Sequence, residues 1–173
     1  PRPRLQNPHM HLLEGFVALA EATGKTRYGE QAKALVALFR KRFLDAATGT
    51  IGEYFDAAWQ PDAGRGHITE PGHHFEWSWL LRRHAGLTRD TSLLPLADRL
   101  HDWAMLRGFD REQGGFFDEI DRQGAPVRQT KRIWPLTECI KSTAARLAAA
   151  PSDAGRKQPS LLLDLLFQRY LKA

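Results

Sequence analysis

The segment 71–81 reads PGHHFEWSWLL and carries the clearest helical pattern of the chain. It predicts a helix from about His73 to Ala85, because apolar side chains recur there at helical spacing. The predicted stripe on one side of this helix consists of Trp77, Leu80, Leu81 and His84.

His73 and Glu76 lie one helical turn apart in this segment and therefore share a face. A carboxylate near an imidazole can hold its tautomer and raise its basicity, which suits proton transfer. Trp77 or Trp79 would then supply an apolar wall on which a sugar ring stacks. The competing interpretation is structural, with a helix that starts at Gly72, Glu76 in its first turn and the tryptophans in the core. The residues alone favour neither interpretation.

A second segment, residues 7–14, reads NPHMHLLE. We expect Asn7 to cap a helix that has Pro8 at its first position. His9 and His11 would share a face in extended backbone, but in a helix they diverge by roughly 200°. The cap is therefore favoured over a two-histidine metal clip. No metal site is predicted, because a third and a fourth ligand are missing at recognisable spacing.

A third segment, residues 131–138, reads KRIWPLTE. Basic and aromatic residues precede a helix that has Pro135 in its first turn. The structural explanation of Glu138 is that a carboxylate near a helix start interacts favourably with the helix dipole. Each of the three segments thus lies at a predicted helix start, marked by Asn7, Gly72 and Trp134.

Helical periodicity predicts six helices, at about residues 9–22, 26–44, 73–85, 92–107, 135–147 and 160–171. Two similar inserts, residues 49–56 and 114–121, begin about 65 positions apart and are typical of short β-hairpins or extended loops. Residues 151–159 are rich in polar and turn residues and are predicted to form a surface loop.

Six helices in three hairpins, with the inserts on one side, predict an all-α fold that is part of an α/α toroid. A helical bundle is the alternative. In an alternating toroid the odd helices share one direction and one layer, so the three helix starts would surround one end of a central cavity. This convergence predicts one site built from all three segments.

Composition narrows the function classes further. The chain has 173 residues, 42% of them hydrophobic and 26% charged, and a net charge of +5. The basic residues are scattered and form no run of five, so nucleic-acid binding is not expected. No apolar run approaches the roughly 20 residues of a membrane span. The single cysteine, Cys139, cannot form an internal disulfide, and we expect a reducing, cytoplasmic location.

The sequence resembles the N-acylglucosamine 2-epimerase superfamily, which includes mannose isomerases and cellobiose 2-epimerases. The resemblance covers essentially the whole chain in the expected order. It rests on residues 7–14, 49–59, 71–81, 108–116 and 131–138.

The resemblance implies a catalytic pair, with His73 as an acid/base and Glu76 as its sugar-binding partner. It also implies substrate contacts at Asn7, His11, Trp134 and Glu138, to which the residue pattern adds Trp77 as the apolar wall. No cofactor is implied.

The family fold is an α/α barrel of six helical hairpins, so residues 1–173 look like one partial domain from the middle-to-late part of it. The early hairpins, which supply a substrate-binding arginine in the family, have no counterpart here. The late segment with the second catalytic histidine is missing as well. We therefore expect the chain alone to be inactive, and to associate with the remainder of its barrel or with a copy of itself.

The leading hypothesis is a sugar isomerase or epimerase that moves a proton at carbon 2 through an enediol. Return of the proton to the neighbouring carbon isomerises an aldose to a ketose, and return to the other face gives the 2-epimer. One alternative is an α/α-toroid glycoside hydrolase with two carboxylates, drawn from Glu53, Asp56, Glu76 and Asp118. Another is a non-catalytic carbohydrate-binding fragment.

Overall fold

The computed structural model describes residues 4–151 and 153–171, and helices dominate these ranges. The α-helices are α1 (Asn7–Thr23), α2 (Thr26–Leu38), α3 (Pro71–Thr88), α4 (Leu94–Arg107), α5 (Ile133–Ala149) and α6 (Asp153–Tyr170). A π-helical turn (Phe39–Phe43) extends α2, and a short 3-10 helix (Thr91–Leu93) leads into α4. None of the helices in these ranges is both long and apolar enough to cross a membrane.

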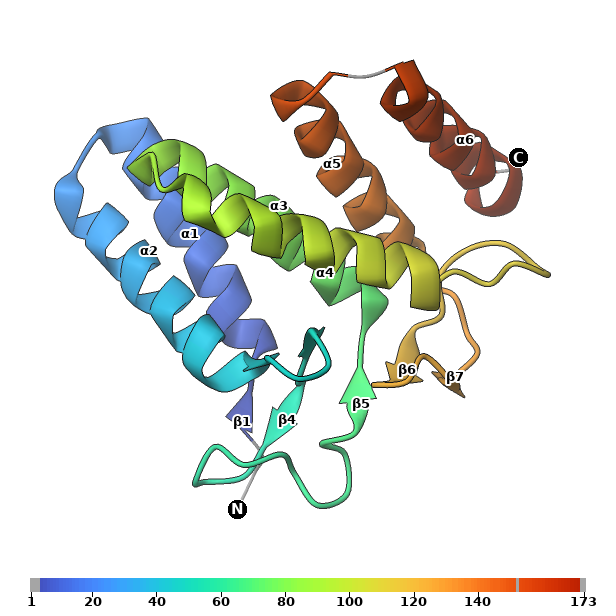
Figure 1. The fold of residues 1–173 in the computed structure, drawn as a ribbon, viewed down its shortest axis with the longest axis horizontal. Coiled ribbons are helices and arrows are strands. Elements are labelled where there is room, and N and C mark those ends of the chain that lie inside the picture. Colours follow the sequence, from blue (N-terminus) through green and yellow to red (C-terminus); the bar gives the residue numbers. More distant parts are fainter. Residues whose placement is uncertain (1–3, 152, 172–173) are drawn as a thin grey trace.

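The helices pack as three consecutive hairpins, α1 with α2, α3 with α4, and α5 with α6. Helix α3 also contacts α1 on one side and α5 on the other, so the odd helices form one layer (Figure 1). The predicted all-α fold, part of an α/α toroid, is confirmed. Because α3 is covered on several sides, its buried residues are not confined to one stripe.

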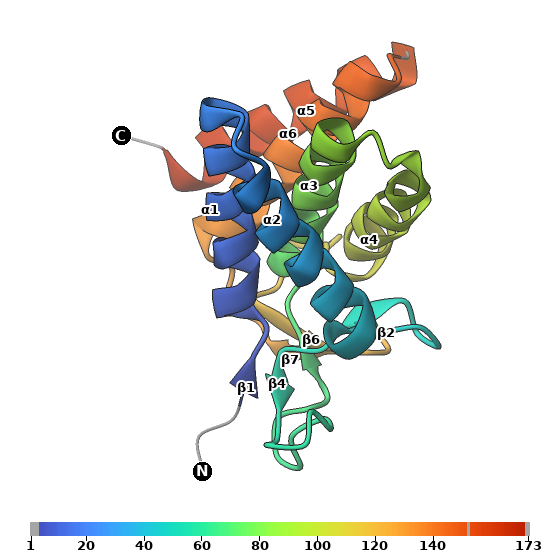
Figure 2. The ribbon, with the colours of Figure 1, turned by 90° about the vertical axis from the view of Figure 1, so that its left-hand side faces the viewer.

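Short strands lie at the end of the molecule where α1 and α3 begin, as both Figure 1 and Figure 2 show. Strand β1 (Arg4–Leu5) pairs with β4 (Tyr54–Phe55), and β2 (Leu44–Asp45) pairs with β3 (Thr50–Ile51), both antiparallel. Strand β6 (Glu119–Asp121) lies between β5 (Ile68–Thr69) and β7 (Pro126–Arg128).

The two predicted inserts are thus extended, and the second one ends in a hairpin, because β6 pairs with β7 just beyond residue 121. In the first insert, β3 and β4 pair with strands outside it. In the second, β6 pairs with β5, which joins this insert to the segment that leads into α3. The strands therefore fix the positions of the residues that precede α3.

Two predicted boundaries are wrong. Asn7 is the first residue of α1 rather than its cap; the cap position is Gln6, which makes no side-chain cap hydrogen bond. Helix α6 already begins at Asp153 and contains Pro159, so the predicted loop over residues 151–159 is mostly helix. A proline inside a helix costs about 3 kcal/mol, but the leucines that follow it, Leu162 among them, pack into the core beside Phe116 and offset that cost.

Candidate active site

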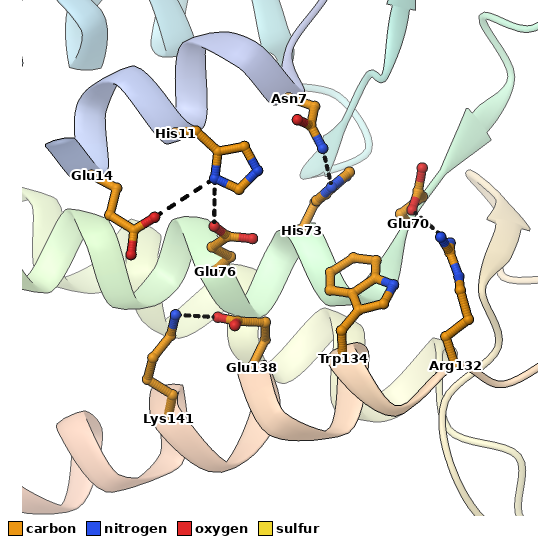
Figure 3. A pocket seen from close by; sticks show the side chains of 10 residues that line it. All are labelled: Asn7, His11, Glu14, Glu70, His73, Glu76, Arg132, Trp134, Glu138 and Lys141. Carbon is orange, nitrogen blue, oxygen red and sulfur yellow. Dashed lines mark hydrogen bonds and ion pairs between the residues drawn. The ribbon is translucent and has the colours of Figure 1, made fainter.

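A cavity of about 480 Å³ lies where the N-terminal parts of α1, α3 and α5 meet, the end that the three sequence segments predicted (Figure 3). Polar and charged side chains predominate around it. Its lining residues are Asn7, His11, Glu14, Glu70, His73, Glu76, Arg132, Trp134, Glu138 and Lys141. The structure therefore brings together six of the seven site residues proposed from sequence, and Trp77 is the exception.

His73 is anchored by a buried carboxylate. Its Nδ1 lies 2.9 Å from Oε2 of Glu53, which also accepts a hydrogen bond from Nε2 of Gln6 at 2.8 Å. The other oxygen of Glu53 accepts the backbone N–H of Glu70 at 3.2 Å. These contacts fix Nδ1–H of His73 as a donor to Glu53, so Nε2 is the nitrogen left for the cavity.

Asn7 occupies the position facing that nitrogen. Its side-chain amide lies 3.0 Å from Nε2 of His73. An amide offers both a donor and an acceptor, so it can donate to the neutral ring or, turned over, accept from the protonated ring. Asn7 is thus suited to both states of a group that gives and takes a proton.

The electrostatics of the pair favour a charged imidazolium. Burial alone would lower the pKa of His73, but the charge and hydrogen bond of Glu53, with the charges of Glu70 and Glu76, raise it to about 9. Burial would raise the pKa of Glu53, but the charge of His73 and the donated hydrogen bonds hold it below its ordinary value. The two groups thus stabilise one another as an ion pair.

A second carboxylate, Glu76, lies on the same face of α3 one turn after His73 and also lines the cavity. Its Oε1 is 3.4 Å from Nδ1 of His11, which is also 3.6 Å from Oε2 of Glu14. Burial and the nearby charge of Glu138 raise the pKa of Glu76, although His73, His11 and Lys141 oppose this. Figure 3 shows His11 above Glu76, and Glu138 paired with Lys141 below it.

The other wall is formed by Trp134 and the residues beside it. The Trp134 ring centroid lies 5.1 Å from that of His73. A Cβ on Gly72 would overlap the six-membered ring of Trp134, so only glycine lets the indole lie against the start of α3. Arg132 lies over the same ring and pairs with Glu70 at 3.4 Å and with Asp118 at 3.1 Å.

Glu70 is a cavity carboxylate whose pKa is strongly raised. Burial raises its pKa to about 7, helped by the charges of Glu53 and Glu119 and opposed by those of His73 and Arg132. It precedes Pro71, the first residue of α3, which places it beside His73.

The structure corrects the expectation that Trp77 lines the sugar site. Trp77 is fully buried, stacks on Phe39 with ring centroids 4.0 Å apart, and donates its Nε1–H to Oε1 of Gln6 at 2.7 Å. Its place in the apolar stripe of α3 already pointed toward the core. The aromatic wall of the cavity is Trp134.

His9 and His11 do not form a clip, in agreement with the preference for a helical start. Nδ1 of His9 lies 2.9 Å from the carbonyl of Leu5, and its ring packs against Phe43 and Trp59. Ligand-type atoms of His11, Glu14 and Glu76 do lie within 4.8 Å of one another, a spacing that a cation could bridge. The expectation from the sequence that no metal is bound stays a prediction.

Sequence reasoning missed several residues of the site. Glu53 was considered only as a carboxylate of a hydrolase, and Glu14, Glu70, Arg132 and Lys141 were given no role. The hydrolase interpretation finds little support, because Glu53 and Asp118 are committed to protein partners. Asp56 is exposed and bonds to the backbone of its own turn. Glu70 and Arg132 lie directly before the starts of two helices. This position was the only feature of the sequence that pointed to a role in the site.

The chain matches the model of the N-acylglucosamine 2-epimerase (GlcNAc 2-epimerase) family over residues 1–172. It is 36% identical over 162 residues to a mannose-6-phosphate isomerase of Rhizobium meliloti (strain 1021), a match that covers 90% of this chain and 42% of that protein. A D-mannose isomerase of Pseudomonas cannabina pv. alisalensis is 31% identical, over 82% of this chain and 38% of its own length. The chain thus spans less than half the length of these relatives.

Solved structures share the fold. The crystal structure of a D-mannose isomerase superposes with a TM-score of 0.87 at 23% identity, over 100% of this chain and 48% of that one. A glycoside hydrolase family 76 mannosidase of Bacteroides thetaiotaomicron VPI-5482 gives 0.82 at 11% identity, over 97% of this chain and 45% of its own. At these identities the likeness concerns architecture alone.

Proposed function

Because the chain belongs to the N-acylglucosamine 2-epimerase family, we propose that His73 is the base of a sugar isomerase or epimerase acting at carbon 2. The observation that carries this proposal is the contact of His73 Nδ1 with Glu53 at 2.9 Å, which leaves Nε2 beside Asn7 in the cavity. A buried carboxylate that orients an imidazole toward a cavity is the arrangement that proton abstraction requires.

The proposed step begins with neutral His73, the form whose share grows as the pH rises toward the pKa of about 9. Its Nε2 takes the proton from carbon 2 of an open-chain aldose, the C–H electron pair forms the double bond to carbon 1, and the carbonyl oxygen gains a proton to give the enediol. Return of a proton to carbon 1, with loss of the proton on oxygen 2, yields the ketose. Glu76, one turn along α3 from His73, and His11 of α1 hold the hydroxyl groups of the sugar, and Trp134 covers one face of it.

We favour isomerisation, such as mannose to fructose, over epimerisation. The extent of the matches agrees with this, since D-mannose isomerases match 80–90% of this chain and a cellobiose 2-epimerase of Bacteroides fragilis matches 53%.

The part of the cavity that these three hairpins build suits an uncharged sugar better than a sugar phosphate. Both of its basic side chains are already paired, Arg132 with Glu70 and Lys141 with Glu138. Glu14 and Glu76 add further negative charge. A phosphate dianion would meet carboxylates and no free cation among the described lining residues.

The other half of the site comes from outside these three hairpins. Helix α1 exposes Leu12 (52%) and Leu19 (42%), and α6 exposes Leu161 and Phe167. Such apolar faces at both ends of the three-hairpin arc suit further hairpins of a barrel, or a second copy of the chain.

Turnover tests the proposal in the longest natural polypeptide that contains residues 1–173, called the full polypeptide below. It is incubated with mannose, mannose 6-phosphate, N-acetylglucosamine and cellobiose, and the products are identified by NMR. We expect conversion of mannose to fructose, loss of turnover in His73→Gln, and normal turnover in His67→Gln, whose side chain is exposed outside the cavity. Cleavage of mannosides without conversion of any free sugar would contradict the proposal.

A further inference from the structure

His74, the neighbour of His73, lies on the opposite side of α3 and does not reach the cavity. It is fully buried and stacks on Trp103 of α4, with ring centroids 4.5 Å apart and planes 18° apart. Its Nδ1 is 3.0 Å from the carbonyl of Glu70, and its Nε2 is 3.1 Å from the backbone nitrogen of Ile51. The ring therefore connects the start of α3 to Ile51, the last residue of β3, directly before the loop that carries Glu53.

The two partners determine the protonation state of His74. A backbone N–H can only donate and a carbonyl can only accept, so Nε2 must be the acceptor and Nδ1 must carry the proton. Burial lowers the pKa of His74 to about 4, despite its hydrogen bond to Glu70 and the charge of Glu53, so the ring stays neutral at and above neutral pH. His74 is thus a permanent connector with a defined tautomer.

The connection matters because Ile51 is two residues before Glu53. Thr69 Oγ1 donates to the Ile51 carbonyl and the Gly52 N–H donates to the Phe43 carbonyl, each at 2.8 Å. Gln6 and the Glu70 N–H hold Glu53 itself, so His74 is the side chain that ties the preceding strand to α3 through its ring. A shift of this loop would move the Glu53 carboxylate away from His73. Displacements of about 1 Å at a reacting group can cost on the order of 100-fold in rate.

We infer that His74 is a positioning residue for the proton-transfer pair, because it joins the loop that carries Glu53 to the helix that carries His73. The inference rests on the proposed function of that pair, and it assigns His74 no contact with substrate. Its measurable consequence is the pKa of His73, which depends on the distance to Glu53.

Three variants separate this role from general stabilisation. His74→Phe keeps an aromatic ring beside Trp103 and loses both hydrogen bonds. His74→Gln can place an amide oxygen near the position of Nε2 and keep the link to Ile51. His101→Phe is the matched control, since His101 is another buried, neutral histidine of the core, bonded to Ser142 on α5 and outside the cavity.

The pKa of His73 is measured in each protein by NMR titration of its ring. In His74→Phe we expect it to fall by about 1–2 units, because burial is then no longer offset by a close Glu53. In His74→Gln and His101→Phe we expect it to stay near the value of the unchanged protein. The other charged groups facing His73, which are Glu70, Glu76, His11 and Arg132, are the same in all variants.

An unchanged pKa in a folded His74→Phe protein would overturn the inference, and so would an equal fall in His101→Phe. If His74→Phe does not fold, His74→Asn replaces it, since its shorter amide reaches only the Glu70 carbonyl; equal pKa values in the Asn and Gln variants would also overturn the inference. The titration needs no substrate, so its outcome does not depend on whether the proposed isomerase activity is found.

Discussion

Glu53 precedes His73 by 20 residues in the chain, and its Oε2 accepts the Nδ1–H of His73 at 2.9 Å inside the protein. The contact joins the loop after β3 to the first turn of α3. Both side chains are almost completely buried, so water screens their charges little.

Replacing Glu53 with Gln tests what this contact does. The amide oxygen still accepts the Nδ1–H and keeps the tautomer, but the negative charge is gone. We expect the pKa of His73 to fall from about 9, because burial then acts with less opposition. The rising limb of kcat/KM against pH should move to lower pH in the full polypeptide. Asp56→Asn, an exposed position, is the control, and an unmoved limb in Glu53→Gln would contradict the assignment.

Stability should depend on pH through the same group. The pKa of His73 is raised from about 6.5 when unfolded to about 9 when folded. Its contribution is therefore fully present below pH 6.5 and is lost as the pH rises to about 9. We expect the free energy of unfolding to fall by on the order of 2 kcal/mol between pH 7 and 9.

Urea unfolding at several pH values measures this fall, with His73→Gln as the reference. The charge of His73 lowers the pKa of Glu70, so both proteins are compared in a Glu70→Gln background, in which that group is absent. The difference between the two proteins should shrink as the pH rises. A difference that is constant from pH 7 to 9 would show that the pKa of His73 is not raised.

Gly72→Ala should damage the aromatic wall. The added methyl group overlaps the Trp134 ring, which has to move, and we expect a loss of about 1–3 kcal/mol in the free energy of unfolding. Gly86→Ala in the same helix meets nothing within 4 Å and should stabilise by up to about 1 kcal/mol. Urea midpoints of the two variants decide the matter; equal effects would mean that Trp134 does not pack on Gly72.

A polypeptide limited to residues 1–173 should not isomerise mannose. Its three hairpins supply only part of the proposed site, with one histidine base that a buried carboxylate orients. We expect turnover to appear in the full polypeptide, or when a second copy or the missing hairpins complete the barrel. Light scattering and NMR assays of the purified 173-residue polypeptide test this. Turnover at an ordinary enzymatic rate by a monomer of these residues would contradict it.

The sequence located the candidate site, but it did not show which side chains contact one another there. Helical spacing placed Asn7, Gly72 and Trp134 at the starts of alternate helices, and alternation in a toroid brings such starts together. Glu53 could not be linked to His73 in this way, because it follows a two-residue strand with no periodicity and its partner is fixed only by tertiary contacts.

Trp77 and Trp134 show a different limit. Both are aromatic residues beside a proposed site residue. The burial of α3 between α1 and α5 places Trp77 in the core, as its position in the apolar stripe indicated, whereas Trp134 lies at the cavity. The helix through Pro159 was predicted to be a loop for a related reason. Packing of the leucines after Pro159 outweighs the local preference of proline against helix.

The central claim, that His73 removes the proton from carbon 2, is tested most directly by hydrogen exchange in D₂O. The full polypeptide is incubated with mannose, and NMR follows deuterium at carbon 2 of the recovered mannose and at carbon 1 of any fructose. We predict deuterium at these positions with the unchanged protein and with His67→Gln, and none above the uncatalysed background with His73→Gln. Exchange at an undiminished rate in His73→Gln would contradict the account.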